Sequence, residues 1–542
     1  MIGKSLKSFH IAGIALAVLA LALPASARDG GVSLRFDGAG ITSLQYGDTE
    51  FLADGHMSVQ KATLRDTAGH PTDAGTVATA TLTDPSAHTV TQTFPWGVVR
   101  CAYATAGNRL DITIGVTNKS AQTLSGIWIQ PITLKFPHAP QGWSPNYVYM
   151  GTNAGAPTVT YANFDSGSLT VCNDDVSRPL LCGFPGRSDL LERPVWVCTS
   201  NIGWLSPMLD SVVVRPIPPG KTDTFHISIR FGGRSATAKQ LASDIYRKFT
   251  RTYPQTLRWA DRRCIAALHL STSEPEYHSA SNPRGWFMDK SLDAISEAGR
   301  AAFRKRLLDY ADESIRVLKN MNAQGMVTWD IEGQQYPHAT SYIGDPRLVG
   351  TLAPEMDVIA DDYFRKFRDA GLRTGVCVRP QMLSHTDDKT EQQWIDDPDK
   401  ISDLLHAKIA YASKRWGCTL FYVDSNGDPN VPFDVAIFQR VASRLKRDKI
   451  EALLMPEHQA TRYYAYTAPY DELRQNITGT PDAVTDIYPG AFGAIYAPDG
   501  PIEADHDALV AAVKRGDILM FRGWWDDPQN AAIKKIYTDA GK

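Results

Sequence analysis

The sequence has few cysteines and almost no excess of charge. Its 542 residues include seven cysteines, an odd number spread thinly along the chain, which excludes a disulfide framework. Basic and acidic residues nearly balance, at 56 and 59, and the formal net charge is −3. A nucleic-acid partner normally requires a basic face, so we expect no binding to nucleic acid.

Six of the seven cysteines fall into two groups with different expected roles. Three are close enough in sequence for one bridge to form in an oxidising compartment, namely Cys172, Cys182 and Cys198. Three others lie in predicted buried strands, where we expect small core residues, namely Cys264, Cys377 and Cys418.

Long apolar runs are also missing. The run Ile11 to Leu23 has 13 residues, too few to cross a hydrocarbon layer of about 30 Å. Lys4 and Lys7 precede this run and Pro24-Ala25-Ser26-Ala27 follows it, which is the pattern of a secretory signal peptide over residues 1–27. Cleavage after Ala27 removes two lysines and changes the formal charge from −3 to −5. We therefore expect an exported protein, periplasmic or secreted, with no membrane span after cleavage.

Several catalytic signatures are absent. The chain has no G-x-S-x-G nucleophile elbow, no phosphate loop and no H-E-x-x-H zinc motif. His269 lacks the second histidine of an H-x-H strand. Residues 424–428, DSNGD, partly resemble a calcium loop, but Pro429 follows and the twelfth position has no glutamate. We predict neither a metal nor a cofactor.

Residues 28–235 have the pattern of a β-sandwich. Short β-like segments such as SLRFDG, ITSLQYG, RLDITIGVTN and FHISIRFG alternate with Gly, Asn, Asp and Pro. In residues 236–263, apolar residues recur at the spacing of a helix as far as Pro254, so we expect a helical linker between two domains.

Residues 264–542 alternate strands and helices and predict a (β/α)₈ barrel. Six strands are clear, at 264–273, 325–333, 372–380, 418–427, 451–458 and 517–525, and the stretch 483–498 could supply two more. An open doubly wound sheet is the rival fold, but no G-x-G-x-x-G turn follows the first strand.

The stretch CTLFYVDSNG, residues 418–427, supplies the first catalytic candidate. It predicts a buried parallel strand with Asp424 at its carboxyl end and Tyr422 on the same face. Other predicted strands also end in polar residues: Asp330 and Glu332, Arg379, Glu457 and His458, and Arg522 with Trp524 and Trp525. Apolar strands with charged carboxyl ends indicate an active site at the C-terminal mouth of the barrel.

A pair of carboxyl groups is what glycoside hydrolysis requires, one to protonate the leaving oxygen and one to attack or to activate water. We predict Asp424 as nucleophile or base and Glu457 as general acid, with Asp330 and Glu332 as the alternative pair. Residues expected to bind sugar rings or hydroxyls are Trp286, Tyr336, Tyr422, Trp524, Trp525, His458, Arg379 and Arg522. Trp329 alternates with Asp330, so we expect it to pack under the helices.

The domain order and the Tyr-x-Asp of the fourth strand resemble a known superfamily. Segments such as GAGITSLQYGDTEFL and PPGKTDTFHISIRFG are similar to the galactose-mutarotase-type supersandwich found before many polysaccharide-active domains. Together with Tyr422-x-Asp424, they resemble the retaining α-galactosidases and α-glucosidases. That resemblance implies Asp424 as nucleophile and an acid/base Asp on the sixth strand, where Asp486 is the nearby candidate. The α-amylase-like families instead pair a fourth-strand Asp with a fifth-strand Glu, which would be Asp424 and Glu457.

The function predicted from these patterns is that of an exported glycosidase, a retaining glycoside hydrolase acting on an oligo- or polysaccharide. A non-catalytic carbohydrate-binding protein on the same scaffold is the alternative. A polysaccharide lyase, with a Tyr, His or Lys base in place of the acid pair, is a third possibility. The expected partner is a carbohydrate in each case.

Overall fold

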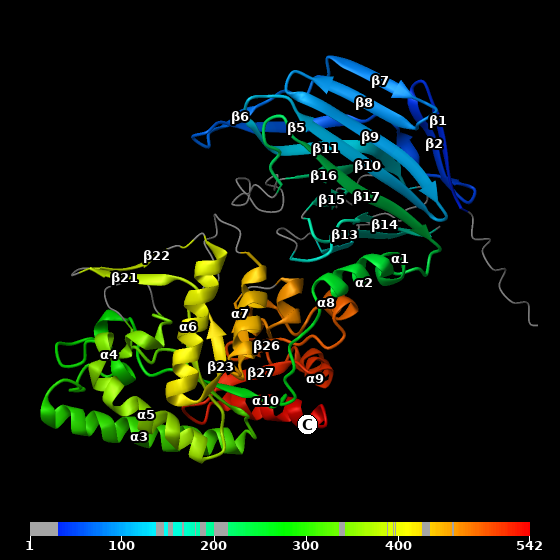
Figure 1. The fold of residues 1–542 in the computed structure, drawn as a ribbon. Coiled ribbons are helices and arrows are strands. Elements are labelled where there is room, and N and C mark those ends of the chain that lie inside the picture. Colours follow the sequence, from blue (N-terminus) through cyan, green and yellow to red (C-terminus); the bar gives the residue numbers. More distant parts are fainter. Residues whose placement is uncertain are drawn as a thin grey trace, which may run out of the picture.

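The protein has two domains, a β-sandwich and a parallel barrel, joined by two helices (Figure 1). The computed structural model describes residues 31–136, 146–149, 155–164, 167–178, 180–184, 191–199, 215–334, 342–386, 389–393, 395, 397–424, 434–457 and 460–542. The predicted signal peptide, Tyr336 and His458 lie outside these residues.

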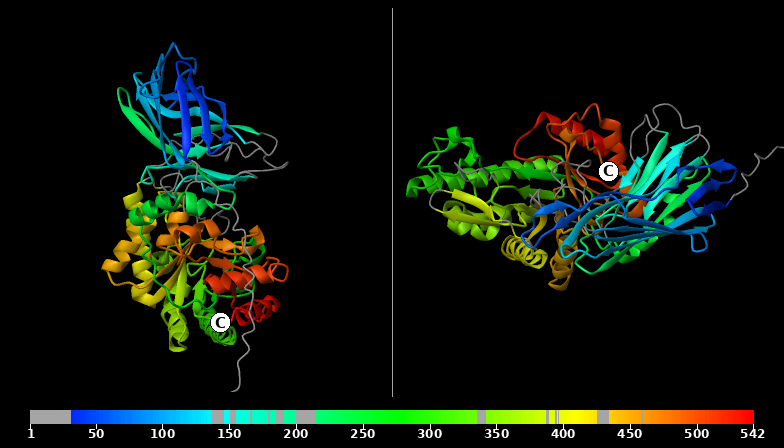
Figure 2. Two further views of the ribbon diagram at one scale, coloured as in Figure 1. Left: turned by 90° about the vertical axis from the view of Figure 1, so that its right-hand side faces the viewer. Right: turned by 90° about the horizontal axis from the view of Figure 1, so that it is seen from above.

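The sandwich consists of two large antiparallel sheets and a small one (Figure 2). The eight-stranded sheet contains β12 (Asn146–Tyr149), β13 (Val159–Phe164), β14 (Gly167–Asn173), β17 (Thr222–Gly232), β10 (Arg109–Asn118), β9 (Gly97–Ala106), β8 (Thr89–Phe94) and β7 (Ala80–Asp84), in this order. The six-stranded sheet contains β15 (Leu181–Gly183), β16 (Glu192–Cys198), β11 (Thr123–Lys135), β5 (Ser58–Arg65) and β6 (Pro71–Asp73), with β4 (Leu52–Asp54) paired to β11. The small sheet contains β1 (Val32–Asp37), β2 (Gly40–Tyr46) and β3 (Thr49–Glu50).

Alternation of side chains explains the sandwich core. Along β10, every second residue is buried, including Leu110, Ile112 and Ile114, while the residues between them are partly exposed. Because successive side chains of a strand point to opposite faces, this places one apolar row against the facing sheet.

Helices α1 (Ala238–Leu241) and α2 (Ser243–Thr252) connect the domains. Thr237 and Gln240 form a capping box at the start of α1. On α2, Phe249 packs 6.2 Å from the ring of Tyr488 in the barrel domain, and the Tyr488 hydroxyl donates to the Tyr253 carbonyl at 2.7 Å. These buried contacts fix the linker against the barrel.

The second domain is a closed barrel of eight parallel strands. In chain order they are β18 (Ile265–Leu268), β19 (Gly325–Thr328), β20 (Thr374–Val378), β23 (Cys418–Val423), β24 (Leu453–Pro456), β25 (Tyr470–Glu472), β26 (Ala494–Tyr496) and β27 (Ile518–Arg522). β18 pairs with both β19 and β27, and a parallel bridge between Glu457 and Tyr470 joins β24 to β25. The predicted fold class, a β-sandwich followed by a (β/α)₈ barrel, is confirmed.

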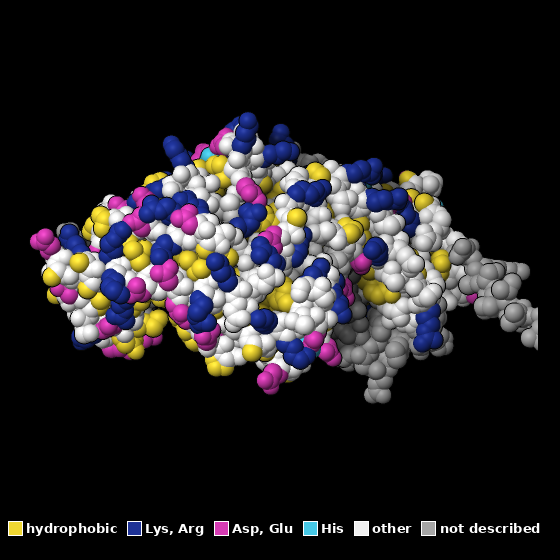
Figure 3. Space-filling model, turned by 90° about the horizontal axis from the view of Figure 1, so that it is seen from below, with side chains coloured by type: hydrophobic (Ala, Val, Ile, Leu, Met, Phe, Trp, Pro, Cys, Tyr) yellow, Lys and Arg dark blue, Asp and Glu magenta, His cyan; other side chains and the backbone are white. Residues whose placement is uncertain are grey.

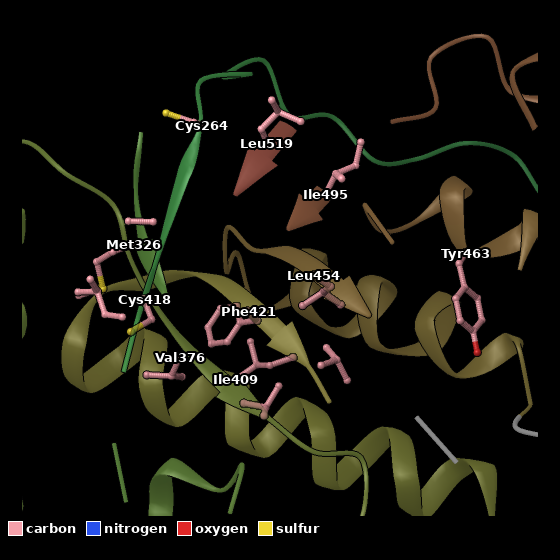
Figure 4. Packing of buried hydrophobic residues seen from close by; sticks show 14 of the residues in the cluster. Cys264, Met326, Val376, Ile409, Cys418, Phe421, Leu454, Tyr463, Ile495 and Leu519 are labelled. Carbon is pink, nitrogen blue, oxygen red and sulfur yellow. The ribbon is translucent and has the colours of Figure 1, made fainter. Parts of the chain in front are cut away.

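Helices cover the outside of the barrel. They are α3 (Glu297–Asn320), α4 (Val349–Leu352), α5 (Pro354–Asp369), α6 (Pro398–Trp416), α7 (Ala436–Arg447), α8 (Asp482–Ile487), α9 (His506–Arg515) and α10 (Pro528–Asp539), with short 3₁₀ turns at Pro275–Tyr277, Trp286–Met288, Pro346–Leu348, Thr461–Ala465 and Leu473–Gln475. Figure 4 shows outward-facing strand residues such as Val376 and Phe421 packed near Ile409 of α6. This apolar layer holds the strands in register.

The C-terminal mouth of the barrel lies on the side toward the sandwich. The hairpin β21 (Met382–Thr386) and β22 (Lys389–Gln393) follows the carboxyl end of β20 and lies on that side in Figure 1. The Arg462 amide, in the 3₁₀ turn that follows β24, donates to the carbonyl of Gly155 in the sandwich domain at 2.7 Å. The sandwich therefore lies near the loops that surround the mouth.

The stretch 483–498 was considered as a source of two strands, but it supplies only one. Residues 482–487 form helix α8, and the stretch contains one strand, β26. The sixth strand is instead β25, only three residues long between Pro469 and Leu473. A strand this short has too few residues to display an alternating pattern in the sequence.

All seven cysteines are free and buried. Burial raises the pKa of Cys172 to about 12, although Arg230 opposes the shift, and this keeps the thiol protonated. The bridge considered for the cysteines of the sandwich is not formed in this structure.

The face of the barrel domain farther from the sandwich is mixed in character. Figure 3 shows basic and acidic side chains interspersed over it, with small apolar areas between them. The described part of the chain contains no helix that is long and apolar enough to cross a membrane.

Candidate active site

Successive residues of each strand point alternately into the barrel and out toward the helices, and this alternation decides which side chains reach the inside. The interior cluster includes Val327, Cys377, Tyr422, Met455 and Met520. Since alternate residues share a face, the residues two positions further along point into the mouth. They are Trp329, Arg379, Asp424, Glu457 and Arg522, and the corresponding residue after Ala267 on β18 is His269.

Asp424 and Glu457 extend their strands by one residue. The Asp424 amide donates to the carbonyl of Val378 at 2.9 Å, and the Glu457 amide donates to the carbonyl of Val423 at 3.0 Å. These bonds continue the parallel ladder across β20, β23 and β24 beyond the last strand residues. The backbone therefore places the two carboxyl groups on adjacent strands at the same end of the barrel.

The Asp424 carboxylate is at the centre of a buried polar network. It is 6% exposed, forms an ion pair with Arg379 and accepts a hydrogen bond from the Tyr422 hydroxyl at 3.3 Å. Burial raises the pKa of Asp424, Arg379 opposes the shift and the nearby Glu457 carboxyl group adds to it.

Arg379 is fixed by the loop that precedes α4. Its amide donates to the carbonyl of Gly344 at 2.8 Å, and its Nε donates to the carbonyl of Tyr342 at 2.6 Å. Gly344 has a φ of 62°, and a Cβ at this position would lie 2.7 Å from Arg379 atoms. Glycine therefore permits the close approach that orients the guanidinium toward Asp424.

Aromatic rings form one wall below the carboxyl pair. The ring centroids of Trp329 and Tyr422 are 4.6 Å apart, and those of Tyr422 and Tyr470 are 4.7 Å apart. Trp329 was expected to pack under the helices, and this expectation is wrong. Val327 and Trp329 point into the barrel, while Thr328 points outward to the Tyr363 hydroxyl on α5, at 3.1 Å.

A second group of aromatic and basic side chains follows β27. The rings of Trp524 and Trp525 are 4.4 Å apart, and the ring of His269 lies 5.2 Å from Trp524. Trp525 is 39% exposed. Arg522 is paired with Asp499 and lies 3.3 Å from Asp527. Trp525 therefore offers an accessible ring edge, while both acids hold the guanidinium of Arg522.

Asp330 and Glu332 lie away from this network. Asp330 is fully buried and accepts hydrogen bonds from the amides of Leu270 and Ser271, at 3.0 and 2.7 Å, and from the Ser271 hydroxyl at 2.7 Å. It therefore ties the end of β18 to the loop after β19. Glu332 is also fully buried, and neither carboxyl oxygen has a hydrogen-bond partner among the described residues.

The electrostatic surroundings of Glu332 are distinct from those of Asp424. Burial raises the pKa of Glu332 to about 8, and Asp345 and Asp330 act in the same direction while Lys408 opposes them. Glu332 is therefore largely protonated at neutral pH. The structure brings Asp424, Glu457, Arg379 and Tyr422 together and separates Asp330 and Glu332 from them.

Trp286 does not reach the mouth. It is fully buried, its Nε1 donates to Glu355 at 2.9 Å, and its ring packs 5.5 Å from Phe303 of α3. The side chain belongs to the helix layer, so it offers no face on which a sugar could stack.

Asp486 is on α8 rather than on the sixth strand, and it is paired with Lys239 of α1 at 3.1 Å. The acid that does end the sixth strand is Glu472, which was absent from the sequence prediction. It accepts hydrogen bonds from Tyr470, Arg474 and Gln475 at 3.2, 2.7 and 3.1 Å. The sequence YDELR contains an aromatic-x-acid pattern similar to Tyr422-x-Asp424, which was the available signal.

The described residues contain no group of three or more His, Cys, Asp or Glu side chains arranged to hold a metal ion. The polar groups at the mouth are carboxyl, guanidinium and phenol groups. This set can hold and move protons and bind hydroxyl groups.

Comparison with solved structures identifies the class of fold. The α-N-acetylgalactosaminidase NagBb from Bifidobacterium bifidum, solved as a GalNAc complex, matches with a TM-score of 0.53 and 11% identity, over 94% of this chain and 92% of that one. The galactosidase domain of the α-galactosidase-sucrose kinase AgaSK matches with a TM-score of 0.42 and 10% identity, over 94% and 74% of the two chains. The α-galactosidase TtGalA from Thermus thermophilus, in complex with stachyose, matches with a TM-score of 0.38 and 9% identity, over 81% of this chain and 99% of that one.

The chain thus has a glycosidase-like fold, a β-sandwich followed by a parallel barrel, as expected from the resemblance of its domain order. No protein-family model and no curated protein matches the sequence. The likeness is one of fold alone, so residue roles must be argued from this chain's own site.

Proposed function

We propose that this protein is a glycoside hydrolase that uses Asp424 and Glu457 as its carboxyl pair. The observation that carries the proposal is the buried network in which Asp424 contacts Arg379, Tyr422 and Glu457 at the mouth of the barrel. Burial raises the pKa of Asp424. A pair with one acid and one carboxylate is the minimum for glycosidic cleavage.

The roles within the pair follow from the position of Arg379. The guanidinium contacts Asp424 and opposes the rise in its pKa that burial causes, so we assign the carboxylate role to Asp424 and the acid role to Glu457. Asp424 then attacks the anomeric carbon or activates water, and Glu457 protonates the leaving oxygen. Retaining and inverting enzymes separate their carboxyl groups by about 5 Å or more.

The substrate is proposed to be an oligo- or polysaccharide. Trp524 and Trp525 supply rings for stacking, and the first candidates are α-N-acetylgalactosaminides and α-galactosides, because the protein with the similar fold was solved with GalNAc. Export to the periplasm or the medium is part of the proposal and rests on the signal pattern of residues 1–27. N-terminal sequencing of the exported protein tests it, and an intact Met1 would contradict it.

The test is hydrolysis of a panel of aryl α- and β-glycosides and polysaccharides by the mature protein, together with Asp424→Asn and Glu457→Gln. Glu503→Gln, at an exposed position on the barrel domain, is the matched control. We expect wild type and control to cleave one substrate and both site variants to lose that activity while remaining folded. Retained activity in either site variant would show that the pair is assigned wrongly.

A non-catalytic carbohydrate-binding protein is the second candidate. The ion pair between Arg379 and Asp424 favours it, since a carboxylate held by a guanidinium is less available as a nucleophile. Wild type that binds a glycan in calorimetry but cleaves no member of the panel would support this candidate over the hydrolase.

A further inference from the structure

Lys408 is a buried cation on the outer side of the barrel. It lies on α6 and is fully buried, and its Nζ donates to the carbonyls of Arg379 and Gln381, both at 2.8 Å. Burying a lysine is costly unless the ammonium is paired and hydrogen-bonded. The hydrogen bonds of Lys408 are directed to the backbone at the carboxyl end of β20, the segment that carries Arg379.

The other neighbours of Lys408 join a second loop to this backbone. Asp345 lies 3.6 Å from Nζ and also binds Arg347 through two hydrogen bonds, at 2.8 and 2.7 Å. The Glu332 carboxyl group also lies close enough to influence Lys408, and its ionised form raises the pKa of the ammonium. Asp345 follows directly on Gly344, whose carbonyl accepts from the amide of Arg379. One ammonium group therefore holds together the loops after β19 and β20.

Arg379 is thereby fixed on both sides of its Cα. Its amide is held by Gly344 and its carbonyl by Lys408, so the guanidinium extends from a rigid backbone toward Asp424. When hydrogen bonds hold both the amide and the carbonyl of a residue, its side chain extends toward its partner from a fixed backbone position. A preorganised site requires such fixed positions.

We propose that Lys408 is a positioning residue, which acts through the backbone of Arg379 to hold its guanidinium against Asp424. This inference rests on the proposed function, in which Arg379 stabilises the carboxylate form of Asp424. Lys408 itself lies behind β20 and does not contact the substrate.

The inference predicts a change in pH dependence. Three groups act on the Asp424 carboxyl: Arg379 lowers its pKa and Glu457 raises it, while Tyr422 donates a hydrogen bond that lowers it. If Arg379 loses its position, the pKa of Asp424 rises. The carboxylate is then protonated up to a higher pH, so the acidic limb of kcat/KM moves to higher pH.

The experiment compares Lys408→Met with Lys414→Met, which removes an exposed lysine from the same helix. We expect Lys408→Met to lower kcat by about 100-fold with a smaller change in KM, and to move the acidic limb of kcat/KM to higher pH. Lys414→Met should match wild type. A folded Lys408→Met protein with an unchanged acidic limb would overturn the inference. If Lys408→Met does not fold, Lys408→Leu, which also removes the donor, is measured by the same criteria.

A double variant separates positioning from general stability. If Lys408 acts through Arg379, adding Lys408→Met to Arg379→Ala should cause no further loss of kcat, although the melting temperature still falls. Additive losses of kcat would contradict the inference.

If wild type cleaves no substrate, the proposed function fails, but the positioning role can still be tested. A crystal structure of Lys408→Met should then show the Arg379 guanidinium displaced from Asp424. An unchanged ion pair in that structure would overturn the positioning role by itself.

Discussion

Two pairs of acids follow strands of the same barrel, yet their surroundings differ. Asp424 and Glu457 continue the inward rows of β23 and β24 and meet at the mouth. Asp330 follows Trp329 in the turn after β19, where its carboxyl group accepts hydrogen bonds from the amides of Leu270 and Ser271. The same sequence signal, an acid at a strand end, therefore has two structural outcomes: a side-chain network at the mouth, and a tie between two loops.

The largest expected effect is that of Asp424→Asn. The amide keeps the size of the side chain but cannot carry the negative charge, so we expect kcat to fall by about 10²- to 10⁴-fold. Initial rates on the best substrate of the panel measure the effect. Asp48→Asn, at an exposed position in the sandwich, is the control and should retain full activity. A loss of less than tenfold would remove Asp424 from the chemical step.

Asp330 should affect stability instead. Asp330→Ala leaves the amides of Leu270 and Ser271 and the Ser271 hydroxyl without their acceptor, so we expect a loss of about 3 kcal/mol in the free energy of unfolding. Urea denaturation measures this loss, with Asp48→Ala as the control. A loss below about 1 kcal/mol would mean that Asp330 does not tie the two loops together.

The sequence was informative for the fold and for the inward pair. Long apolar strands such as Cys418–Val423 are buried on both faces, which makes them recognisable without a partner. Which residues of β19 point into the barrel was harder to predict, because the last regular residue of the strand is Thr328 and the chain turns at Asp330–Gly333. No periodicity extends across such a turn, and Trp329 was placed on the wrong face.

Contacts made through the backbone could not be predicted from the sequence. Lys408 is one basic residue in a helix that contains several, and its burial depends on the carbonyls of Arg379 and Gln381, which are distant in the chain. The three-residue strand β25 likewise depends on its neighbours, because its pairing with β26 and its bridge to Glu457 define it. The positions of Glu472 and Lys408 therefore depend on tertiary contacts, and the sequence patterns did not single out either residue.

Glu332→Gln should sharpen the comparison through the pH dependence of stability. The folded-state pKa of Glu332 is raised to about 8, so the folded protein binds more protons than the unfolded chain between pH 4.5 and 8. The stability of wild type therefore falls through this window, by at most about 1.4 kcal/mol per pH unit from this group. Glutamine does not titrate, so the variant should gain stability relative to wild type from pH 5 to pH 8.

Urea denaturation of both proteins at several pH values measures the difference attributed to Glu332. Asp345, Lys408 and Asp330 also act on the Glu332 carboxyl group. Their own contributions to stability are present in both wild type and Glu332→Gln, and they cancel in the comparison unless the substitution changes their charge. A constant difference across the window would mean that Glu332 is ionised in the folded protein. Loss of hydrolysis in this variant would instead return Glu332 to the catalytic candidates.

The smallest expected effect is that of Trp525→Ala, at the accessible edge of the mouth. Its ring packs against Trp524 and lies 5.9 Å from the guanidinium of Arg522, and 39% of its surface remains exposed. A stacking contact of this kind contributes about 1 kcal/mol, so KM should rise by about 2- to 10-fold with kcat nearly unchanged. Val358→Ala, which trims an exposed apolar side chain on α5, is the control. A fall in kcat with KM unchanged would instead place Trp525 among the residues that stabilise the transition state. The catalytic residues would then include more than the carboxyl pair Asp424 and Glu457.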